Sequence, residues 1–387
     1  MTVEFFDLGQ RLHAAHVGHP VLRVAASFFR LHAHPIMLQA NVDDDGNVHA
    51  TIGTAAGAIE RVSGAAVLDS LSNAGAGFGD RAMVQLIVPT AASLTALSQI
   101  AREHSSHEAS AVIGWACDRA GYPGTSAVVN LLAVSRQRYI TGGAPEAERT
   151  EDGWRAAFGL PEGIGGLAQW AVRLADGELL PALLQIGEDD QYSFGVAAKQ
   201  FAAGRDWSKS DAAPVAAVSL RQRCDTADLW SAALLTDRLW RHRATHTGHV
   251  CGGEVVESAR TGFTMVCERM DSRLKSGTAI CGWPGGTDSY NRATTFHGEI
   301  GDADAAGGAL RLTVRGVRAE HRPPVGHWAT VMSAAPDQRV VRSGQFKYRQ
   351  KQFTPDSWMA SGRKPGLARR DAPLDVLVAA AEREGQE

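Results

Sequence analysis

The chain has 387 residues, of which 44% are hydrophobic and 21% are charged. This length and composition permit two or three domains with buried cores and exclude general disorder. The five cysteines are odd in number, far apart and without a CxxC pair, which argues against a disulfide framework. The sequence contains neither a signal-peptide pattern nor an apolar run long enough to span a bilayer, and therefore predicts a cytoplasmic location.

The small net charge of −3 conceals an asymmetry along the chain. Residues 1–204 carry a net charge of −8, residues 205–370 carry +9, and residues 371–387 carry −4. A basic field of this size in the second half favours a polyanionic partner.

Two small, polar and acidic stretches, 141–153 and 202–214, predict linkers. The domains that they separate are an α+β domain (1–140), an α+β extension (154–201), a helix followed by a duplicated β-barrel (215–345), and a basic aromatic segment with a C-terminal helix or tail (346–387).

Strand and helix signals are mixed in the first of these segments. Residues 35–42 and 48–53 flank the turn sequence DDDGN and predict a β-hairpin. MVQLIV (83–88) predicts a buried strand, and a helix with an apolar stripe follows from Pro89-Thr90. VVNLLAV (128–134) predicts a further strand. An α+β fold accounts for this mixture.

In the third segment, residues 225–243 predict one helix with Asp225 or Thr226 as its N-cap. Short β-like runs separated by turns follow, and they contain an internal duplication that relates 251–280 to 296–331. Two such units can close a small pseudo-two-fold barrel without exposed strand edges.

Matched residues carry this duplication. Gly253-Glu254-Val255 corresponds to Gly298-Glu299-Ile300, and Gly277 corresponds to Gly326. The strand spacing is similar to that of the small barrels of riboflavin synthase and flavin reductases, although the Arg-x-Tyr-Ser signature of the reductases is absent. The resemblance implies a barrel that could hold a flavin or another small molecule, with Thr313, Arg315, His327 and Trp328 as candidate pocket residues.

The densest group of metal-ligand residues is His242, His246, His249 and Cys251. Two histidines four residues apart share a helix face, and a helix ending near Gly248 would let the other two turn back, as zinc requires. The alternative is that these residues interact with the dipole at a helix C-terminus.

The region 339–370 carries nine cations against a single acid, Asp356, with aromatic residues interleaved. Cations neutralise phosphates and aromatic rings stack on unpaired bases, so this composition favours RNA or single-stranded DNA. The alternative is an edge strand with buried aromatics and solvated cations. A second candidate patch contains Arg136 and Arg138. The residues of the main segment are Arg339, Arg342, Lys347, Arg349, Lys351, Arg363, Lys364, Arg369 and Arg370, with Phe346, Tyr348, Phe353 and Trp358.

No Walker loop, GxSxG elbow or HExxH helix is present, and no catalytic residue is predicted. The leading hypothesis is a non-catalytic nucleic-acid-binding subunit of a larger, oligomeric nucleoprotein assembly, for which a plasmid, phage or defence system would be a suitable context. The alternatives are an enzyme that binds a small molecule or flavin in the duplicated barrel, and a protein stabilised by zinc at 242–251.

Overall fold

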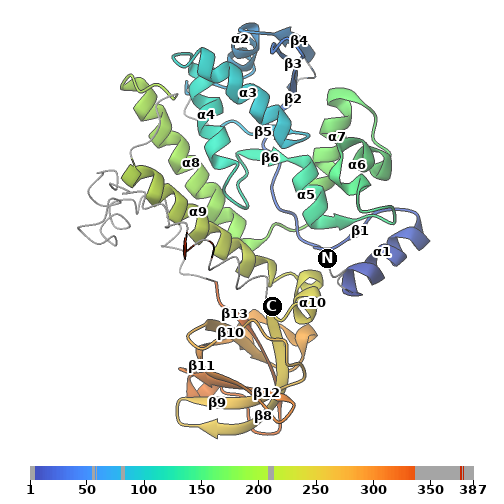
Figure 1. The fold of residues 1–387 in the computed structure, drawn as a ribbon, viewed down its shortest axis with the longest axis vertical. Helices are drawn as coiled ribbons and strands as arrows, with labels where there is room; N and C mark the ends of the chain where they lie inside the picture. Colours follow the sequence, from blue (N-terminus) through green and yellow to red (C-terminus); the bar gives the residue numbers. More distant parts are fainter. Residues whose placement is uncertain are drawn as a thin grey trace. The chain divides into compact units, whose positions relative to one another are not determined.

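The computed structural model describes residues 5–207 and 213–335, apart from 55, 56, 58 and 80–82, together with Asp375, Val376 and Val378 (Figure 1). The chain forms two compact units. The first contains Met1–Ser210 and Arg221–Gln345, and the second contains Asp211–Leu220 and Phe346–Glu387. The architecture below is that of the first unit.

A five-stranded mixed sheet forms the centre of the N-terminal region, in the order β4-β3-β2-β5-β6. The predicted hairpin is confirmed, because β2 and β3 pair antiparallel and the Asp43 carboxylate accepts backbone hydrogen bonds from Asp45 and Asn47 in the turn. β5 pairs parallel with β2, and β6 pairs parallel with β5 at the edge of the sheet. The strands are β2 (Ile36–Val42), β3 (Val48–Gly53), β4 (Ile59–Ser63), β5 (Leu86–Val88) and β6 (Val128–Asn130).

Helices cover both faces of this sheet, because successive strand residues point to opposite sides. Leu86 and Val88 pack with the first helix group, whereas Ile87 between them packs with the second. The first group is α2 (Ala66–Asn73), α3 (Ala91–Glu103) and α4 (Glu108–Arg119). The second group includes α6 (Glu151–Phe158) and α7 (Gly163–Ala175).

Side-chain caps break two segments that apolar patterning alone would continue. The prediction of a strand over 128–134 is wrong beyond residue 130, because the Asn130 side chain accepts a hydrogen bond from the Ala133 amide and starts α5 (Leu131–Arg138). The single helix predicted over 225–243 is also wrong. Residues 213–246 form two helices, α9 (Ala213–Leu234) and α10 (Arg238–His246), and Asp237 is the N-cap of the second.

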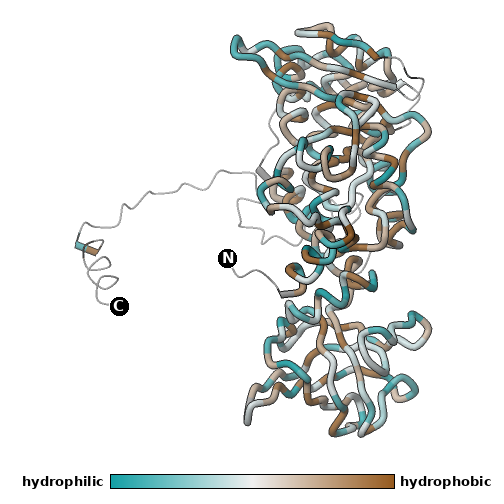
Figure 2. Tube along the Cα trace, turned by 90° about the vertical axis from the view of Figure 1, so that its right-hand side faces the viewer, coloured by the Kyte–Doolittle hydropathy of each residue, from teal (hydrophilic) through white to brown (hydrophobic). Residues whose placement is uncertain are grey.

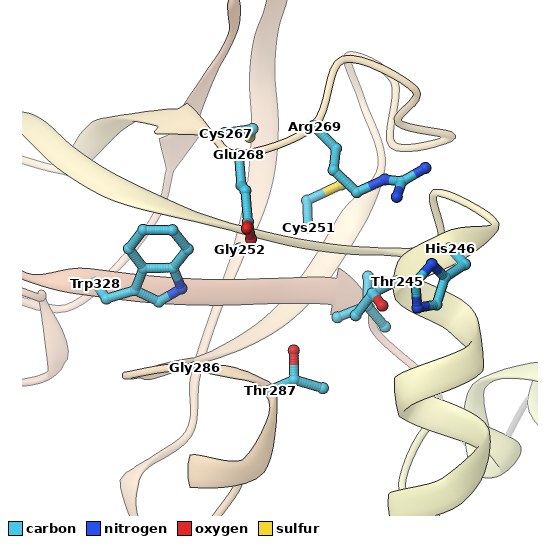
Figure 3. A pocket seen from close by; sticks show the side chains of 11 residues that line it. Thr245, His246, Cys251, Gly252, Cys267, Glu268, Arg269, Gly286, Thr287 and Trp328 are labelled. Carbon is cyan, nitrogen blue, oxygen red and sulfur yellow. The ribbon is translucent and has the colours of Figure 1, made fainter. Parts of the chain in front are cut away.

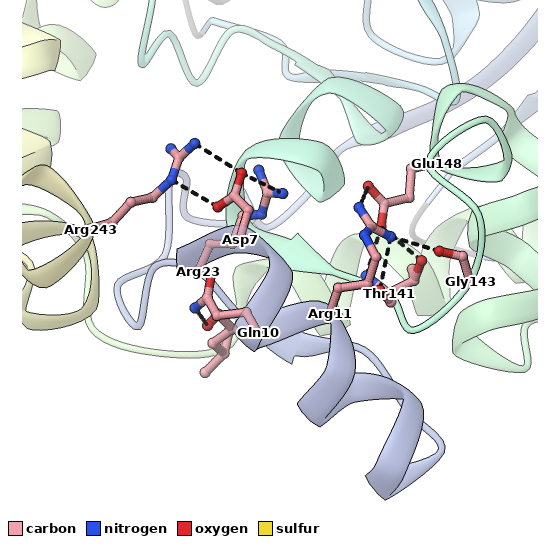
Figure 4. Close-up of polar contacts among 9 residues, drawn as sticks. Asp7, Gln10, Arg11, Arg23, Thr141, Gly143, Glu148 and Arg243 are labelled. Carbon is pink, nitrogen blue, oxygen red and sulfur yellow. Dashed lines mark hydrogen bonds and ion pairs between the residues drawn. The ribbon is translucent and has the colours of Figure 1, made fainter. Parts of the chain in front are cut away.

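The N-terminal helix α1 (Phe5–Val17) is held by ion pairs to distant parts of the chain (Figure 4). Asp7 accepts from Arg243 at 3.0 Å, and Arg11 donates to Glu148 at 2.8 Å. Burial opposes ionisation of Glu148, but hydrogen bonds from Arg11 and Thr141 hold the pKa of this carboxyl below its ordinary value. The segment 141–153 thus contains a buried anchor as well as the 3₁₀ turn Ala147–Arg149.

Three further elements complete the N-terminal region. The short strands β1 (Val21–Leu22) and β7 (Tyr139–Ile140) pair with each other, antiparallel. The long helix α8 (Pro181–Ala202) contributes Phe194 to one apolar core and Ile186 to the other, so it joins the two.

A closed barrel of six antiparallel strands follows, in the order β10-β11-β12-β9-β8-β13. It confirms the predicted α+β class and the predicted small barrel. Apolar and polar residues are mixed along the barrel strands (Figure 2). In β12 every second residue is buried, which places one set of side chains inside the barrel. The strands are β8 (Val250–Ala259), β9 (Gly262–Cys267), β10 (Ala279–Pro284), β11 (Phe296–Ala306), β12 (Ala309–Arg315) and β13 (Trp328–Ser333). Short 3₁₀ turns lie at Thr287–Ser289, Arg292–Thr294 and Ala319–His321.

Strand register shows that the barrel is an internal duplication. The β8–β9 pair has an irregularity between Val255 and Glu257, and the β11–β12 pair has one at the matched position, between Ile300 and Asp302. Outside the strands, the Gly326 amide donates to the Val255 carbonyl, as the Gly277 amide does to Ile300. The two halves therefore share their hydrogen-bonding pattern as well as their sequence pattern.

The pseudo-two-fold axis passes between β9 and β12 and, on the other side of the barrel, between β10 and β13. In each of these pairs the two strands are equivalent members of the two halves. Thr264 of β9 is in register with Thr313 of β12, and their hydroxyl oxygens are 3.3 Å apart. On the other side of the barrel, Gly282 of β10 is in register with Val331 of β13. Residues n and n+49 are equivalent at both crossing points, whereas β8 and β11 are offset by 45 residues. The four additional residues of the second half lie in its β11–β12 hairpin, which has five residue pairs beyond the irregularity where the β8–β9 hairpin has three.

A buried ion pair links α4 to α8. Arg119 donates from Nε to Asp190 Oδ1 at 2.8 Å, and the other carboxylate oxygen of Asp190 accepts from the Thr125 hydroxyl at 2.9 Å and from the Ser126 amide at 3.0 Å. Asp189 also accepts from Arg119 at 3.3 Å. Because both charges are removed from water, loss of one partner leaves the other uncompensated.

The junction between the N-terminal region and the barrel depends on α10. Asp237 Oδ1 accepts from the Trp240 amide at 3.0 Å, and Oδ2 accepts from the amides of Ala25 and Ala26 at the same distance. One turn later, Arg241 donates to the carbonyls of Thr287 and Thr236, each at 3.0 Å. The helix is thus fixed to the N-terminal region by its cap and to the barrel by its buried arginine.

We expect Asp190→Ala to lower the free energy of unfolding by about 3–5 kcal/mol, because Arg119 loses its closest anion and two further donors lose their acceptor. Urea denaturation followed by circular dichroism measures this. Arg238→Gln is the control, since the pair of Arg238 with Asp288 is exposed and its loss should cost less than about 1 kcal/mol. Equal costs for the two variants would contradict the assignment.

We expect Asp237→Ala to cost about 2–4 kcal/mol, because one helix cap and two amide partners are lost together. Asp237→Asn should cost less, since its amide oxygen can still cap α10. Thermal and urea unfolding of the two variants in parallel test this ranking. An alanine variant as stable as the wild type would show that the cap does not hold the junction.

Candidate functional site

A pocket of about 340 Å³ lies where the end of α10 meets the barrel (Figure 3). Three barrel strands, the loop after β10 and the last turn of α10 provide its walls. Its lining residues are Thr245, His246, Val250, Cys251, Gly252, Cys267, Glu268, Arg269, Gly286, Thr287 and Trp328.

Two thiols line this pocket from adjacent strands. Cys251 is on β8 and Cys267 ends β9; Gly253 is in register with Cys267, so both cysteines lie on the same face of the strand pair. The Cys251 Sγ lies 3.0 Å from the Ser272 Oγ, and Cys267 is hydrogen-bonded to Cys251. Both residues are buried.

The environment separates the proton affinities of these thiols. A hydrogen bond from Cys267 lowers the pKa of Cys251, with a further contribution from Ser272, against the opposing effect of burial. The same interaction and burial raise the pKa of Cys267. Cys251 is therefore the thiol that ionises first, and Cys267 is the proton donor that stabilises its thiolate.

The two halves of the barrel have diverged at this site. By strand register, Cys251 lies opposite Val331, and its counterpart Phe296 lies opposite Gly282. Phe296 is buried, and its ring lies so close to Gly282 that a Cβ there would overlap it. At equivalent positions, the second half of the barrel therefore has the ring of Phe296 and the first half has the thiol of Cys251.

Trp328 and Gly252 shape the other wall. A Cβ on Gly252 would lie 2.9 Å from the Trp328 indole nitrogen, so the glycine allows the ring to approach β8 closely. Trp328 was a predicted pocket residue and does line the pocket. Of the other three, Thr313 contacts Thr264 and Arg315 lies in register with Glu299, while His327 is exposed; none is a lining residue.

The four predicted zinc ligands do not converge. His242 Nε2 lies 2.7 Å from Asp288 Oδ1, and His249 Nδ1 lies 2.9 Å from the Thr247 hydroxyl, while Cys251 turns to Ser272. Within the part of the chain that the structure describes, no group of three or more His, Cys, Asp or Glu side chains could hold a metal ion. The structure does not bring these four residues together, because Cys251 lies in β8, whose pairing rather than the helix directs its side chain.

The second predicted basic patch is divided by burial. Arg136 is exposed, but Arg138 is buried and donates to the carbonyls of Leu174 at 2.6 Å and Ala25 at 3.1 Å. Arg138 therefore binds the backbone between α7 and the N-terminal loop. The main predicted set lies outside the described residues: Arg339, Arg342, Phe346, Lys347, Tyr348, Arg349, Lys351, Phe353, Trp358, Arg363, Lys364, Arg369 and Arg370.

The thiol pair was not predicted, because Cys251 and Cys267 are sixteen residues apart and have no ligand-type spacing. The usable signal was the β-hairpin itself, since pairing β8 with β9 brings the two side chains to one face.

The fold and site define an α+β protein with a pseudo-symmetric six-stranded barrel and a cysteine-lined pocket. No family model matches the chain, and neither the curated proteins nor the solved structures contain a match. Among the helices described, none has the length and apolar character needed to cross a bilayer.

We expect Cys251 to react with iodoacetamide at a pH below the range of an ordinary cysteine, because the reactive species is the thiolate and the pKa of this thiol is lowered. The labelling rate should rise as pH increases through that lowered pKa. Peptide mass spectrometry across a pH series gives the midpoint.

Two internal comparisons accompany this measurement. Burial raises the pKa of Cys117 to about 11, so that thiol should label only under strongly alkaline conditions. Ser272→Ala should move the Cys251 midpoint upward, because a hydroxyl partner of the thiolate is lost. A Cys251 midpoint at or above that of a free cysteine peptide would refute the assignment.

Proposed function

We propose that this protein is a non-catalytic nucleic-acid-binding subunit that uses residues 339–370 to bind RNA or single-stranded DNA within a larger assembly. Charge distribution supports the proposal. The barrel region 250–335 contains nine acidic and nine basic residues, whereas 339–370 contains nine cations and one acid. The basic excess of the second half is thus concentrated in the segment that follows the barrel.

The observation that carries this proposal is the closure of the barrel. All six strands find both neighbours within Val250–Ser333, so the barrel leaves no free edge for a seventh strand from the following segment. The alternative explanation for the aromatic and basic pattern at 345–358 was an edge strand with buried aromatics and solvated cations. Barrel closure means that such a strand could not extend the barrel, which supports a role for these side chains outside it.

Within the segment, charge and aromaticity have separate roles. In an extended backbone, Lys347, Arg349 and Lys351 would share one face, since they are spaced by two residues. Cations spaced in this way suit consecutive phosphates, and Phe353 and Trp358 are the aromatic residues best suited to stack on unpaired bases.

Fluorescence polarisation with labelled single-stranded RNA and DNA oligonucleotides tests the proposal. We expect binding that weakens as salt increases, because phosphate contacts release counterions. The triple variant K347Q/R349Q/K351Q should bind more weakly and reduce the slope of log affinity against log salt by about 2.

A triple variant with the same charge loss is the control. K275Q/R292Q/R318Q removes three exposed cations of the barrel region and should retain the wild-type slope. Absence of binding at low salt, or equal losses in both triple variants, would contradict a site in 339–370.

The pocket favours a second candidate function, binding of a small molecule by the barrel. Its volume of about 340 Å³ is at the lower end of the range of small-ligand sites. Visible absorbance of the purified protein would support a flavin, and a melting shift with a flavin would do the same. A colourless protein whose melting temperature no flavin alters would count against it.

A further inference from the structure

The cysteine pair in the pocket has a geometry that neither nucleic-acid binding nor a structural role in the barrel requires. Cys251 and Cys267 lie on the same face of two paired strands, share a side-chain hydrogen bond, and both line a pocket that opens to solvent. The third buried barrel cysteine, Cys281, is not a lining residue. We propose that Cys251 and Cys267 form a redox-active dithiol, in which Cys251 reacts with a peroxide that enters the pocket and Cys267 then closes a reversible disulfide.

The surroundings of Cys251 suit the first step. Ser272 Oγ, 3.0 Å from the sulfur, is fixed by accepting a hydrogen bond from the Leu274 amide at 3.0 Å, so its hydroxyl hydrogen remains available to a thiolate. Arg269 on the pocket rim pairs with Asp271 at 2.7 Å, and because the effect of Asp271 on the pKa of Cys251 is the larger of the two, the activation rests on the hydrogen bonds rather than on this charge. These are the features that activate a thiolate nucleophile.

The reaction balances with hydrogen peroxide as the oxidant. The Cys251 thiolate attacks one peroxide oxygen, the O–O bond breaks, and the departing hydroxide takes a proton to leave as water. Cys251 is then a sulfenic acid. The Cys267 sulfur attacks the Cys251 sulfur, the S–O bond breaks, and the proton of Cys267 leaves with the hydroxide as a second water. The two thiols together supply the two electrons that reduce the peroxide.

The contact between the thiols explains why the second step should outrun further oxidation. Cys267 is already adjacent to the sulfur that it must attack, whereas a second peroxide must enter the pocket. The alternative partners are less favourable: Cys224 is exposed on α9, and Cys281 is on β10, which does not pair with β8.

Peptide mapping of the full-length protein after treatment with hydrogen peroxide tests this inference. Arg260 lies between the two cysteines, so trypsin separates Cys251 in residues 244–260 from Cys267 in residues 261–269, and each peptide contains one cysteine. We expect these peptides to appear joined, with the loss of two hydrogen atoms, and to separate again after treatment with a thiol reductant.

Variants then assign the roles. Cys267→Ser should trap the sulfenic acid on Cys251, detected as a dimedone adduct, and Cys251→Ser should abolish both the adduct and the cross-link. Cys281→Ser is the matched control and should cross-link like the wild type. Wild-type protein that shows no joined peptide, or only a sulfenic or sulfonic acid at a single cysteine, would overturn the proposal. The joined peptide is measured in the wild-type protein, so the test does not depend on whether the variants fold.

Discussion

The arrangement of the barrel pocket depends on one buried carboxylate, that of Asp237. It ends the turn after α9, starts α10, and at the same time accepts two backbone amides from residues 25 and 26. A single side chain therefore fixes the direction of α10, and the last turn of that helix supplies Thr245 and His246 to the pocket. Arg241 completes the connection by placing its guanidinium over the rings of Trp283 and Tyr290. Burial lowers the pKa of Arg241, but nearby Tyr290 and Asp237 oppose that effect and favour the charged form.

Local signals were sufficient to predict much of the fold. The hairpin at 36–53 has its own turn chemistry in Asp43, α3 has an apolar stripe, and the barrel has strands with repeated glycines. The errors came where one polar side chain overrode apolar patterning. Asn130 turns a three-residue strand into a helix, and Asp237 divides what periodicity reads as a single helix. Asn130 lies inside an otherwise apolar stretch, and Asp237 lies between two segments that both have helical periodicity, so the apolar pattern does not indicate a break at either residue.

The site was less predictable than the fold, for a related reason. The zinc hypothesis grouped Cys251 with histidines that precede it in sequence, whereas β-sheet pairing groups it with Cys267. The duplicated barrel shows the same difference between backbone and side chains. The halves share register, bulges and glycines, so the backbone could be inferred from the repeat, but the side chains at equivalent positions have diverged to a thiol in one half and Phe296 in the other. The sequence repeat therefore predicts the backbone of both halves. The position at which the halves differ in side chain, Cys251 against Phe296, is where the first half has a pocket.

The barrel and the basic segment 339–370 differ in how their charges are distributed along the chain. On the barrel exterior, Glu299 lies in register with Arg315, and Asp304 with Arg311, so cross-strand neighbours offset each other. A balanced exterior of this kind produces little field beyond a Debye length, so the proposed attraction of a polyanion depends on the cations of 339–370. Thiol chemistry in the pocket, by contrast, requires only local hydrogen bonds and the entry of a small, neutral oxidant. The proposed thiol chemistry of the barrel therefore does not need the electrostatics that the proposed nucleic-acid binding would demand, so the two proposals can be tested independently.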